Sequence, residues 1–425
     1  MKGREPMNVT ILNMSDDTNK GDFAILENTV RLTRARWPEA VVRVLNVDYD
    51  QQFIDREDKF RRLKSTGVAH YGSFFPKVHS GRRKCLELIR ALAHGIFSIW
   101  ILLAACLGGK KAGSLMPGSK KQSFSAISEA DLVLMKGGSY IFAFGGIGQV
   151  LYLYRMLLAL MIALILKKRV IVLGQSIGPI KGWPARYLAG ACLARCEKIV
   201  LRENISYEYL ITHFQIPEEK LEVWPDLVFW NDKPPAKLPP SESRHKIRIG
   251  FTFRQWAFPE EETGAGRRRL ARDYEAVMVG LIERLAAESR EVSVILHTLE
   301  DRAISDRIVS KAAAVRYYNQ DYSVGELKSI YSDLDILIGT RTHSCIFALS
   351  VGTPVVAVAY QKHKGFGIME MVEEGAFVED IYNFRGDKVL AIIEQIINDY
   401  PCLKNAVETR VNRLNAEISD KFSSL

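Results

Sequence analysis

The sequence predicts an α/β protein built from two doubly wound domains that face a central cleft. Short apolar runs typical of buried strands recur every roughly 30 to 40 residues, with helical patterns between them. The chain has 425 residues, which suits two large domains of about 150 residues or more each. A segment with four prolines, NDKPPAKLPPSESRHK (231–246), separates two halves that repeat the alternation.

The first half begins with a strand pattern, a polar loop and a helix pattern, the unit from which parallel sheets are built. We predict the first domain over 8–232, with a basic and apolar insertion at 51–125. Its expected strands are 9–14, 41–47, 130–138, 169–179, 198–203 and 221–229. Its expected helices are 23–36, 150–166, 184–196 and 205–214.

The second half follows a linker predicted at 233–246. We predict the second domain over 247–386 and a helical tail over 387–425, a candidate for packing back on the first domain. The expected strands are 247–253, 291–298, 315–319, 335–340 and 354–360. In doubly wound sheets, ligands bind beyond the carboxyl ends of the strands, so the loops at those ends are the candidates for a site.

Composition and charge exclude some classes of function and favour others. Hydrophobic residues make up 48% and charged residues 25% of the chain, which is ordinary for a globular protein. The net charge of +9 favours anionic partners, although a merely basic surface is the open alternative. Nucleic acid is not an expected partner, because there is no zinc spacing, helix-turn-helix pattern or basic run with interleaved aromatics.

Cysteines and apolar segments bear on localisation. The six cysteines are sparse and lie mostly in apolar stretches, which predicts free thiols in the cytoplasm. The N-terminus shows no secretory pattern. The apolar segment 150–166 contains Arg155 and is expected as a buried helix. For 91–109, a buried or loop-covering helix is the favoured interpretation. The alternative is peripheral contact with the inner face of the membrane through 81–111.

The sharpest candidate site is IGTRTHS (338–344), at the end of a predicted strand. Arg341 can bind two oxygens of a phosphate or carboxylate, and His343 can exchange a proton near neutral pH. Thr342 or Ser344 can cap the helix expected to start there. The alternative is an Arg341 paired with a carboxylate and a His343 bonded to the backbone.

Other candidates also follow predicted strands. Arg202 is either a second anion clamp or a partner of Glu203. His297 ends the strand at 291–298 and is a candidate for contacting the donor or acceptor. Asp22 is expected as a helix N-cap, with hydroxyl binding as the alternative. Lys362 can extend the anion site or lie in a solvated basic loop. The remaining cleft candidates are Gly21, Gly137, Gly138, Gln175 and Asp226.

These motifs together resemble the polysaccharide pyruvyl transferase family, over about 9–374. The resemblance rests on N-K-G-D (19–22), K-G-G (136–138), G-Q-S-I-G-P (174–179), L-R-E-x-x-S (201–206), G-T-R-T-H-S (339–344) and G-T-P (352–354) with Lys362. Thr342 stands where the family often has an apolar residue, and 51–125 matches nothing in it.

The resemblance implies two Rossmann-like domains on the GT-B glycosyltransferase plan, with the acceptor side first and the donor side second. It implies phosphoenolpyruvate as donor and co-substrate and a surface-polysaccharide sugar, free or lipid-linked, as acceptor. Arg202 and Arg341 would bind the donor and His343 would be the general acid, and no cofactor or metal is implied. Asp22 is our candidate for the general base. The alternatives are a nucleotide-sugar glycosyltransferase of the same plan and a non-catalytic glycan-binding protein.

Overall fold

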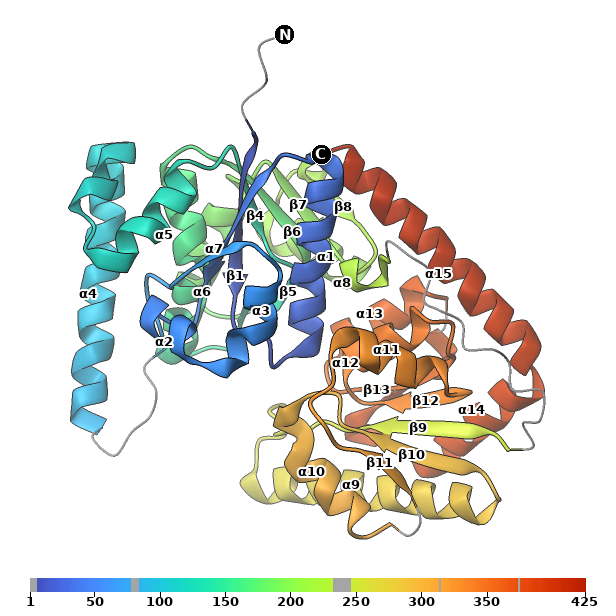
Figure 1. Ribbon diagram of the computed structural model, residues 1–425. Helices are drawn as coiled ribbons and strands as arrows, with labels where there is room; N and C mark the ends of the chain where they lie inside the picture. Colours follow the sequence, from blue (N-terminus) through green and yellow to red (C-terminus); the bar gives the residue numbers. More distant parts are fainter. Residues whose placement is uncertain (1–5, 78–83, 232–245, 313–314, 374) are drawn as a thin grey trace. The chain divides into compact units, whose positions relative to one another are not determined.

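The computed structural model describes residues 6–77, 84–231, 246–312, 315–373 and 375–425. Contacts between Cα atoms divide the chain into two compact units (Figure 1). The first comprises 1–17, 25–224 and Leu425, and the second comprises 18–24 and 225–424. The boundary thus falls before the predicted linker, of which 233–245 lie outside the described residues.

The first unit contains an eight-stranded parallel sheet in the order β3-β2-β1-β4-β6-β7-β8, with β5 paired to β6. Its strands are β1 (Asn8–Met14), β2 (Val41–Asn46), β3 (Ala69–Tyr71), β4 (Leu132–Met135), β5 (Gly138–Ala143), β6 (Arg169–Ile180), β7 (Lys198–Leu201) and β8 (Leu221–Val223). The strands are almost continuously apolar because helices cover the sheet.

The helices of this unit are α1 (Lys20–Arg36), α2 (Gln51–Arg56), α3 (Arg61–Ser65), α4 (Lys84–Gly108), α5 (Gly118–Ser128), α6 (Ile147–Ile165), α7 (Trp183–Leu193) and α8 (Asn204–Phe214). By their contacts, the first residues of α1, up to Ala24, belong to the second unit. A buried salt bridge between Arg155 of α6 and Asp48 explains the charge inside the apolar 150–166 segment.

The second unit contains a six-stranded parallel sheet in the order β11-β10-β9-β12-β13-β14. Its strands are β9 (Arg248–Thr252), β10 (Glu291–Ile295), β11 (Arg316–Tyr318), β12 (Ile336–Gly339), β13 (Val355–Ala359) and β14 (Val378–Asp380). The chain order reverses between β9 and β12, and this switch point is where doubly wound sheets bind ligands. The predicted α/β class with two doubly wound domains is confirmed.

The helices of the second unit are α9 (Gly264–Ala287), α10 (Arg302–Val309), α11 (Val324–Ser332), α12 (Thr342–Leu349), α13 (Lys362–Met371), α14 (Gly386–Asn398) and α15 (Tyr400–Ser423). The predicted helical tail corresponds to α14 and α15. Within this unit α15 packs on α12, on α14 and on the short helix η4 (Leu227–Phe229). The Trp230 indole donates a hydrogen bond to Ser419 Oγ at 2.9 Å, which fixes α15 there.

Two described segments are long and apolar enough to cross a membrane by length and composition, Ile89–Leu115 and Ile147–Ile165. The second, within α6, buries one face that includes Leu153, Leu157 and Leu160. The first, which contains most of α4, is mainly exposed, so the expectation that the helix at 91–109 is buried is wrong.

His70 of β3 makes the first unit sensitive to acid. Its Nε2 lies 2.9 Å from the Leu63 carbonyl oxygen, while Nδ1 is buried with no hydrogen-bond partner among the described residues. Burial is the main cause that lowers the pKa of His70 to about 4. The folded protein therefore favours neutral His70, and this stabilisation is complete above the unfolded-state pKa of about 6.5.

As the pH falls from about 6.5 to about 4, the unfolded state binds a proton that the folded state does not, so stability decreases. The loss of stability is on the order of 2 to 3 kcal/mol. We expect His70→Gln to remove part of it. Urea unfolding of both proteins at pH 7 and pH 4.5 measures the difference. Equal acid sensitivity in the two proteins would contradict the prediction.

Candidate active site

Basic side chains follow three adjacent strands of the second sheet. Arg254 follows β9, His297 follows β10, and Arg341 and His343 follow β12. Since the carboxyl ends of parallel strands meet at one edge, these residues belong to the same end of the sheet, at its switch point. A small pocket at the neighbouring ends of β12 and β13 is lined by Thr340, Thr342 and residues of α13.

Arg341 is buried and occupies the N-cap position of α12. Its Nε donates to Asp301, and its Nη2 lies 2.8 Å from Glu300 Oε2. Burial alone would lower the pKa of Arg341, but the ion pairs with Asp301 and Glu300 raise it above its usual value. The alternative that Arg341 pairs with carboxylates is thus present in the structure. Asp301 is nearly inaccessible whereas Glu300 is 59% exposed, so only the second pair is easily exchanged for a ligand.

His343, on the first turn of α12, packs directly against Gly21 of α1. A β-carbon added to Gly21 would overlap the imidazole at Cβ, Cγ and Nδ1, so only glycine leaves room for the ring. This contact brings the N-K-G-D motif to His343. Gly21 lies in a helix and not in a loop as predicted. Asp22 lies in the first turn of α1 and accepts a hydrogen bond from Asn19 Nδ2 at 2.8 Å. The N-cap prediction for Asp22 is therefore wrong, because α1 begins earlier, at Lys20.

Lys20 is a member of the cluster that the sequence analysis missed. Its side chain is 1% exposed, and Nζ lies 2.7 Å from Asp321 Oδ1, whose carboxylate is 41% exposed. The signal was available, because Lys20 lies within the N-K-G-D motif, but a lysine at a helix start is usually solvated.

His297 lies close enough to Arg341, His343 and Lys20 for their charges to affect its pKa. It is buried, and its Nδ1 lies 2.9 Å from the Tyr331 hydroxyl oxygen. Burial lowers the pKa of His297 well below its usual value, and the positive charges of Arg341, His343 and Lys20 lower it further. His297 is therefore neutral at pH 7. Its Nε2 is buried with no hydrogen-bond partner among the described residues.

Arg254 is a second residue that the sequence analysis missed. Its guanidinium lies 4.3 Å from the centroid of the Tyr360 ring, and its buried Nε has no hydrogen-bond partner in the described part of the chain. Thr252 of β9 pairs in register with Gly339 of β12. Arg254 and Arg341 therefore each stand two residues beyond paired positions on adjacent strands. The sequence FTFRQW (251–256) shows that Arg254 follows the apolar strand, but it does not show that β9 pairs with β12.

The predicted caps of α12 differ from those observed. Ser344 Oγ donates to the Arg341 carbonyl oxygen at 2.7 Å and is hydrogen-bonded to Thr252 Oγ1 at 2.6 Å. Thr342 is the first residue of α12, and no side chain caps this helix. Lys362 begins α13, but its side chain lies outside the described residues.

The first unit holds a separate polar cluster. Arg202, at the end of β7, is fully buried, and its Nε donates to Ser176 Oγ at 2.8 Å. Glu203 accepts from the Ser206 amide at 2.7 Å and so caps α8, and the Arg202 charge also acts on its carboxylate. Burial raises the pKa of Glu203.

The cleft candidates Gly138 and Gln175 lie in strands of the first sheet. Gln175 lies within β6, where its side-chain amide donates to the Lys136 carbonyl oxygen. Gly138 begins β5, and Gly137 precedes it at a position where a β-carbon would lie 2.9 Å from the Gly174 carbonyl oxygen. Gln175 thus lies in the strand predicted at 169–179. The strand predicted at 130–138 is followed directly by β5, which pairs with β6 and was not predicted.

Asp226 belongs by contacts to the second unit and is buried. It caps η4, accepting from the Val228 amide at 2.9 Å. The structure thus gathers Gly21, Asp22, His297, Arg341 and His343 within the second unit, whereas Arg202, Gln175, Gly137 and Gly138 belong to the first.

Comparison with known proteins identifies relatives of the chain. The pattern of the polysaccharide pyruvyl transferase family matches residues 19–362. The amylovoran biosynthesis protein AmsJ of Erwinia amylovora is 23% identical over 311 residues, which cover 70% of this chain and 73% of AmsJ.

Solved structures show the same fold at low identity. A glycosyltransferase from Rickettsia africae has a TM-score of 0.55 and 11% identity, with 99% of each chain covered. MurG of Acinetobacter baumannii has a TM-score of 0.54 and 12% identity, covering 99% of this chain and 100% of MurG. Anabaena Alr3699/HepE, solved with UDP and glucose, has a TM-score of 0.53 and 13% identity, covering 99% and 100%. The chain thus has the two-domain GT-B fold.

Proposed function

The chain belongs to the polysaccharide pyruvyl transferase family and is a transferase of exopolysaccharide biosynthesis, and we propose that its donor is phosphoenolpyruvate. The pyruvyl group would be transferred to two hydroxyls of a saccharide acceptor, free or lipid-linked. The products would be a pyruvate ketal and inorganic phosphate. We place the reaction in the cytoplasm, as the sparse cysteines predict.

The observation that supports this proposal is the basic cluster at the switch point of the second sheet. Phosphoenolpyruvate carries a phosphate and a carboxylate, and the forked donors of Arg254 and Arg341 suit two such groups. Lys20 adds positive charge close enough to His297 to lower its pKa. His297, which burial keeps neutral, can donate a hydrogen bond to an oxygen without adding charge.

The proposed chemistry assigns a role to each remaining group. His343 would donate a proton to the methylene carbon of the donor, which makes the neighbouring carbon electrophilic. One sugar hydroxyl would form a C–O bond to that carbon, and the second would replace the phosphate. One hydroxyl proton restores His343 and the other leaves with the phosphate. Asp22 is the candidate base for a hydroxyl, and Arg202 is the candidate donor ligand in the first unit.

Thermal unfolding with and without millimolar phosphoenolpyruvate tests the donor. At about one hundred times the Kd, bound donor stabilises the folded protein by about 2.7 kcal/mol. We expect a rise in Tm that Arg341→Lys and Arg254→Lys each largely abolish, because lysine lacks the fork that binds two oxygens. Arg272→Lys, an exposed change on α9, is the matched control and should respond like the wild type.

The same experiment distinguishes the competing functions. A rise in Tm with a nucleotide sugar but not with phosphoenolpyruvate would favour a GT-B glycosyltransferase. A response to glycan alone, with no turnover, would favour a non-catalytic binding protein. Either result would overturn the donor proposal.

A further inference from the structure

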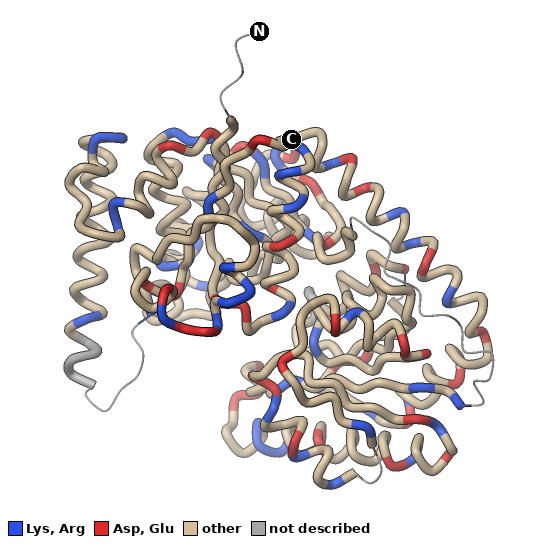
Figure 2. Tube along the Cα trace, in the orientation of Figure 1, with Lys and Arg blue, Asp and Glu red and all other residues tan. Residues whose placement is uncertain are grey.

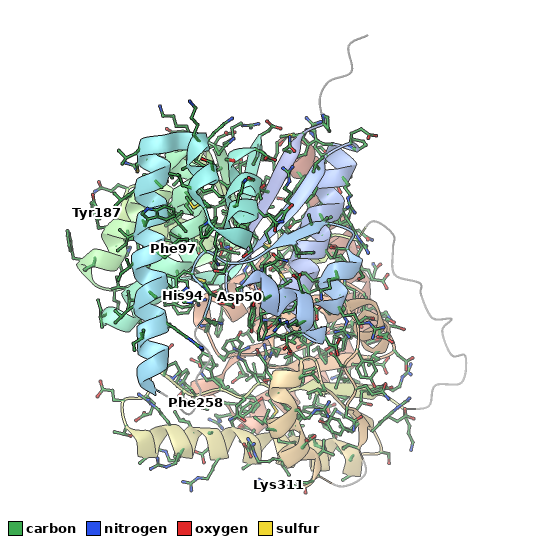
Figure 3. The ribbon with its side chains drawn as sticks, turned by 60° about the vertical axis from the view of Figure 1, so that its left-hand side comes forward. Asp50, His94, Phe97, Tyr187, Phe258 and Lys311 are labelled. Atoms are coloured by element: carbon green, nitrogen blue, oxygen red, sulfur yellow. The ribbon has the colours of Figure 1, made fainter. Side chains whose placement is uncertain are left out.

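Helix α4 presents a continuous apolar face to the outside of the first unit. Its inner face buries Ser98, Ile101 and Ala105, which recur at helical spacing. The opposite face is exposed, with Leu107 reaching 90% and Ile96 reaching 70%. The members of this apolar face are Ile89, Leu92, Ile96, Ile99, Leu103 and Leu107. Figure 3 shows α4 running along the outside of the unit.

Exposed apolar side chains are also present on neighbouring helices of the same unit. α4 packs on α6, and α6 packs on α7. Ile147, at the start of α6, is 77% exposed. Trp183 and Tyr187, at the start of α7, are 75% and 68% exposed and stack with ring centroids 5.8 Å apart. Figure 3 labels Tyr187 on this outer side. Exposed tryptophan and tyrosine are enriched at the interface between lipid and water.

Charge in this part of the chain is mainly positive. Residues 88–128 and 132–196 contain thirteen lysines and arginines and no aspartate or glutamate. They include α5, α6, α7 and all of α4 after Glu87, and the acidic residues Glu129 and Asp131 lie between them. In Figure 2 the trace of α4 is tan along most of its described length, with basic residues toward both ends. The described basic residues at those ends are Arg90 and the pair Lys110 and Lys111.

We propose that this face docks on an anionic lipid bilayer, with the apolar side chains of α4 among the lipids and the basic residues at the headgroups. Apolar burial and attraction to anionic lipids together drive such binding. The inference goes beyond the proposed function, because neither the donor nor the acceptor takes part in it.

The packing of α4 favours lying in the membrane surface over crossing it. Ser98 Oγ is 2.9 Å from the Tyr154 hydroxyl oxygen of α6, and Ile101 is fully buried, so one side of α4 is already occupied by protein. A second copy of the chain is the competing occupant. The absence of acidic residues over 88–128 disfavours it, because two such faces would repel each other.

Sedimentation with vesicles of phosphatidylcholine containing phosphatidylglycerol tests this inference on the full chain without donor or acceptor. We expect wild type to sediment with these vesicles and to bind at least tenfold more weakly to phosphatidylcholine alone. Ile96→Glu/Leu103→Glu should reduce binding at least tenfold, because it places two charges in the apolar face. Val41→Glu is the matched control, since Val41 is exposed on β2, outside α4, and it should bind like the wild type.

Urea unfolding shows whether each variant is folded, and the molar mass in solution shows whether the protein is a monomer or a dimer. Both variants should unfold like the wild type, since the replaced side chains are exposed. Wild type that stays in the supernatant, or a folded double variant that still sediments, would overturn the inference. A wild-type dimer that becomes a monomer in the double variant, with no binding to vesicles, would identify a second copy as the occupant. None of these outcomes depends on whether phosphoenolpyruvate is the donor.

Discussion

Replacing His343 by alanine should lower turnover by a factor of about 10² to 10⁴, the usual contribution of a positioned general acid. His343 lies on the first turn of α12, beside Arg341 and against Gly21. Its side chain is only partly buried, so the free energy of unfolding should change by less than about 1 kcal/mol. Phosphate release in the presence of donor and acceptor measures the turnover, and urea unfolding measures the stability.

Gly21→Ala is the companion variant, because it displaces the imidazole without removing it. Alanine normally favours a helix over glycine by about 1 kcal/mol, so a loss of activity would not reflect a weaker helix. The added methyl group would overlap the ring of His343, and turnover should fall with both His343 and Arg341 still present. Near wild-type turnover in His343→Ala would show that another group supplies the proton.

Replacing Arg341 by alanine should destabilise the second unit by about 3 to 5 kcal/mol, whatever ligand it binds, because it leaves a buried charge without its partner. That charge belongs to Asp301, whose side chain is 3% exposed and whose Oδ1 also accepts from the Gln255 amide at 3.1 Å. Loss of donor binding in Arg341→Ala would therefore not distinguish recognition from partial unfolding. This is why lysine is the better replacement in the donor experiment.

A double variant separates the two effects on stability. Arg341→Met/Asp301→Asn removes both charges and keeps an acceptor for the Gln255 amide, so it should be more stable than Arg341→Ala in urea unfolding. Arg307→Ala is the control for an exposed pair. Arg307 bonds to Glu275 at 2.6 Å but is 43% exposed, and its loss should cost no more than about 1 kcal/mol. Equal stability of Arg341→Ala and wild type would contradict a structural role for the buried pair.

Much of the fold could be predicted because buried parallel strands are almost continuously apolar. The strand predicted at 9–14 is β1, and the strand predicted at 354–360 contains β13. The three-residue strands β3 and β14 were missed, since so short a run carries no periodicity. β5 was missed because the preceding strand was predicted to end at the glycine pair, at 138, where β5 begins.

Only those residues of the candidate site that directly follow a predicted strand could be predicted from the sequence. Arg341 and His297 were found because each follows an apolar run. Lys20 and Arg254 were missed although each lies in a local pattern, because their contacts with Asp321 and Tyr360 are tertiary and cannot be read from the sequence. The exposure of α4 was missed because an apolar helix predicts burial. The sequence does not show whether another part of the protein covers it.

The pairing of β1 with β4 has a consequence for how the first unit folds. Val9 pairs with Leu132, so the centre of the sheet cannot form until the whole intervening segment is available. The entropy of closing such a loop grows only by about 0.6 kcal/mol for each doubling of its length, so the insertion that contains α4 costs little equilibrium stability. Its effect falls on the folding rate, because distant parallel pairing is slow. During synthesis, β1 and β2 are made before the apolar α4, and β4 follows α4. β1 therefore remains without its partner β4 until α4 has been synthesised.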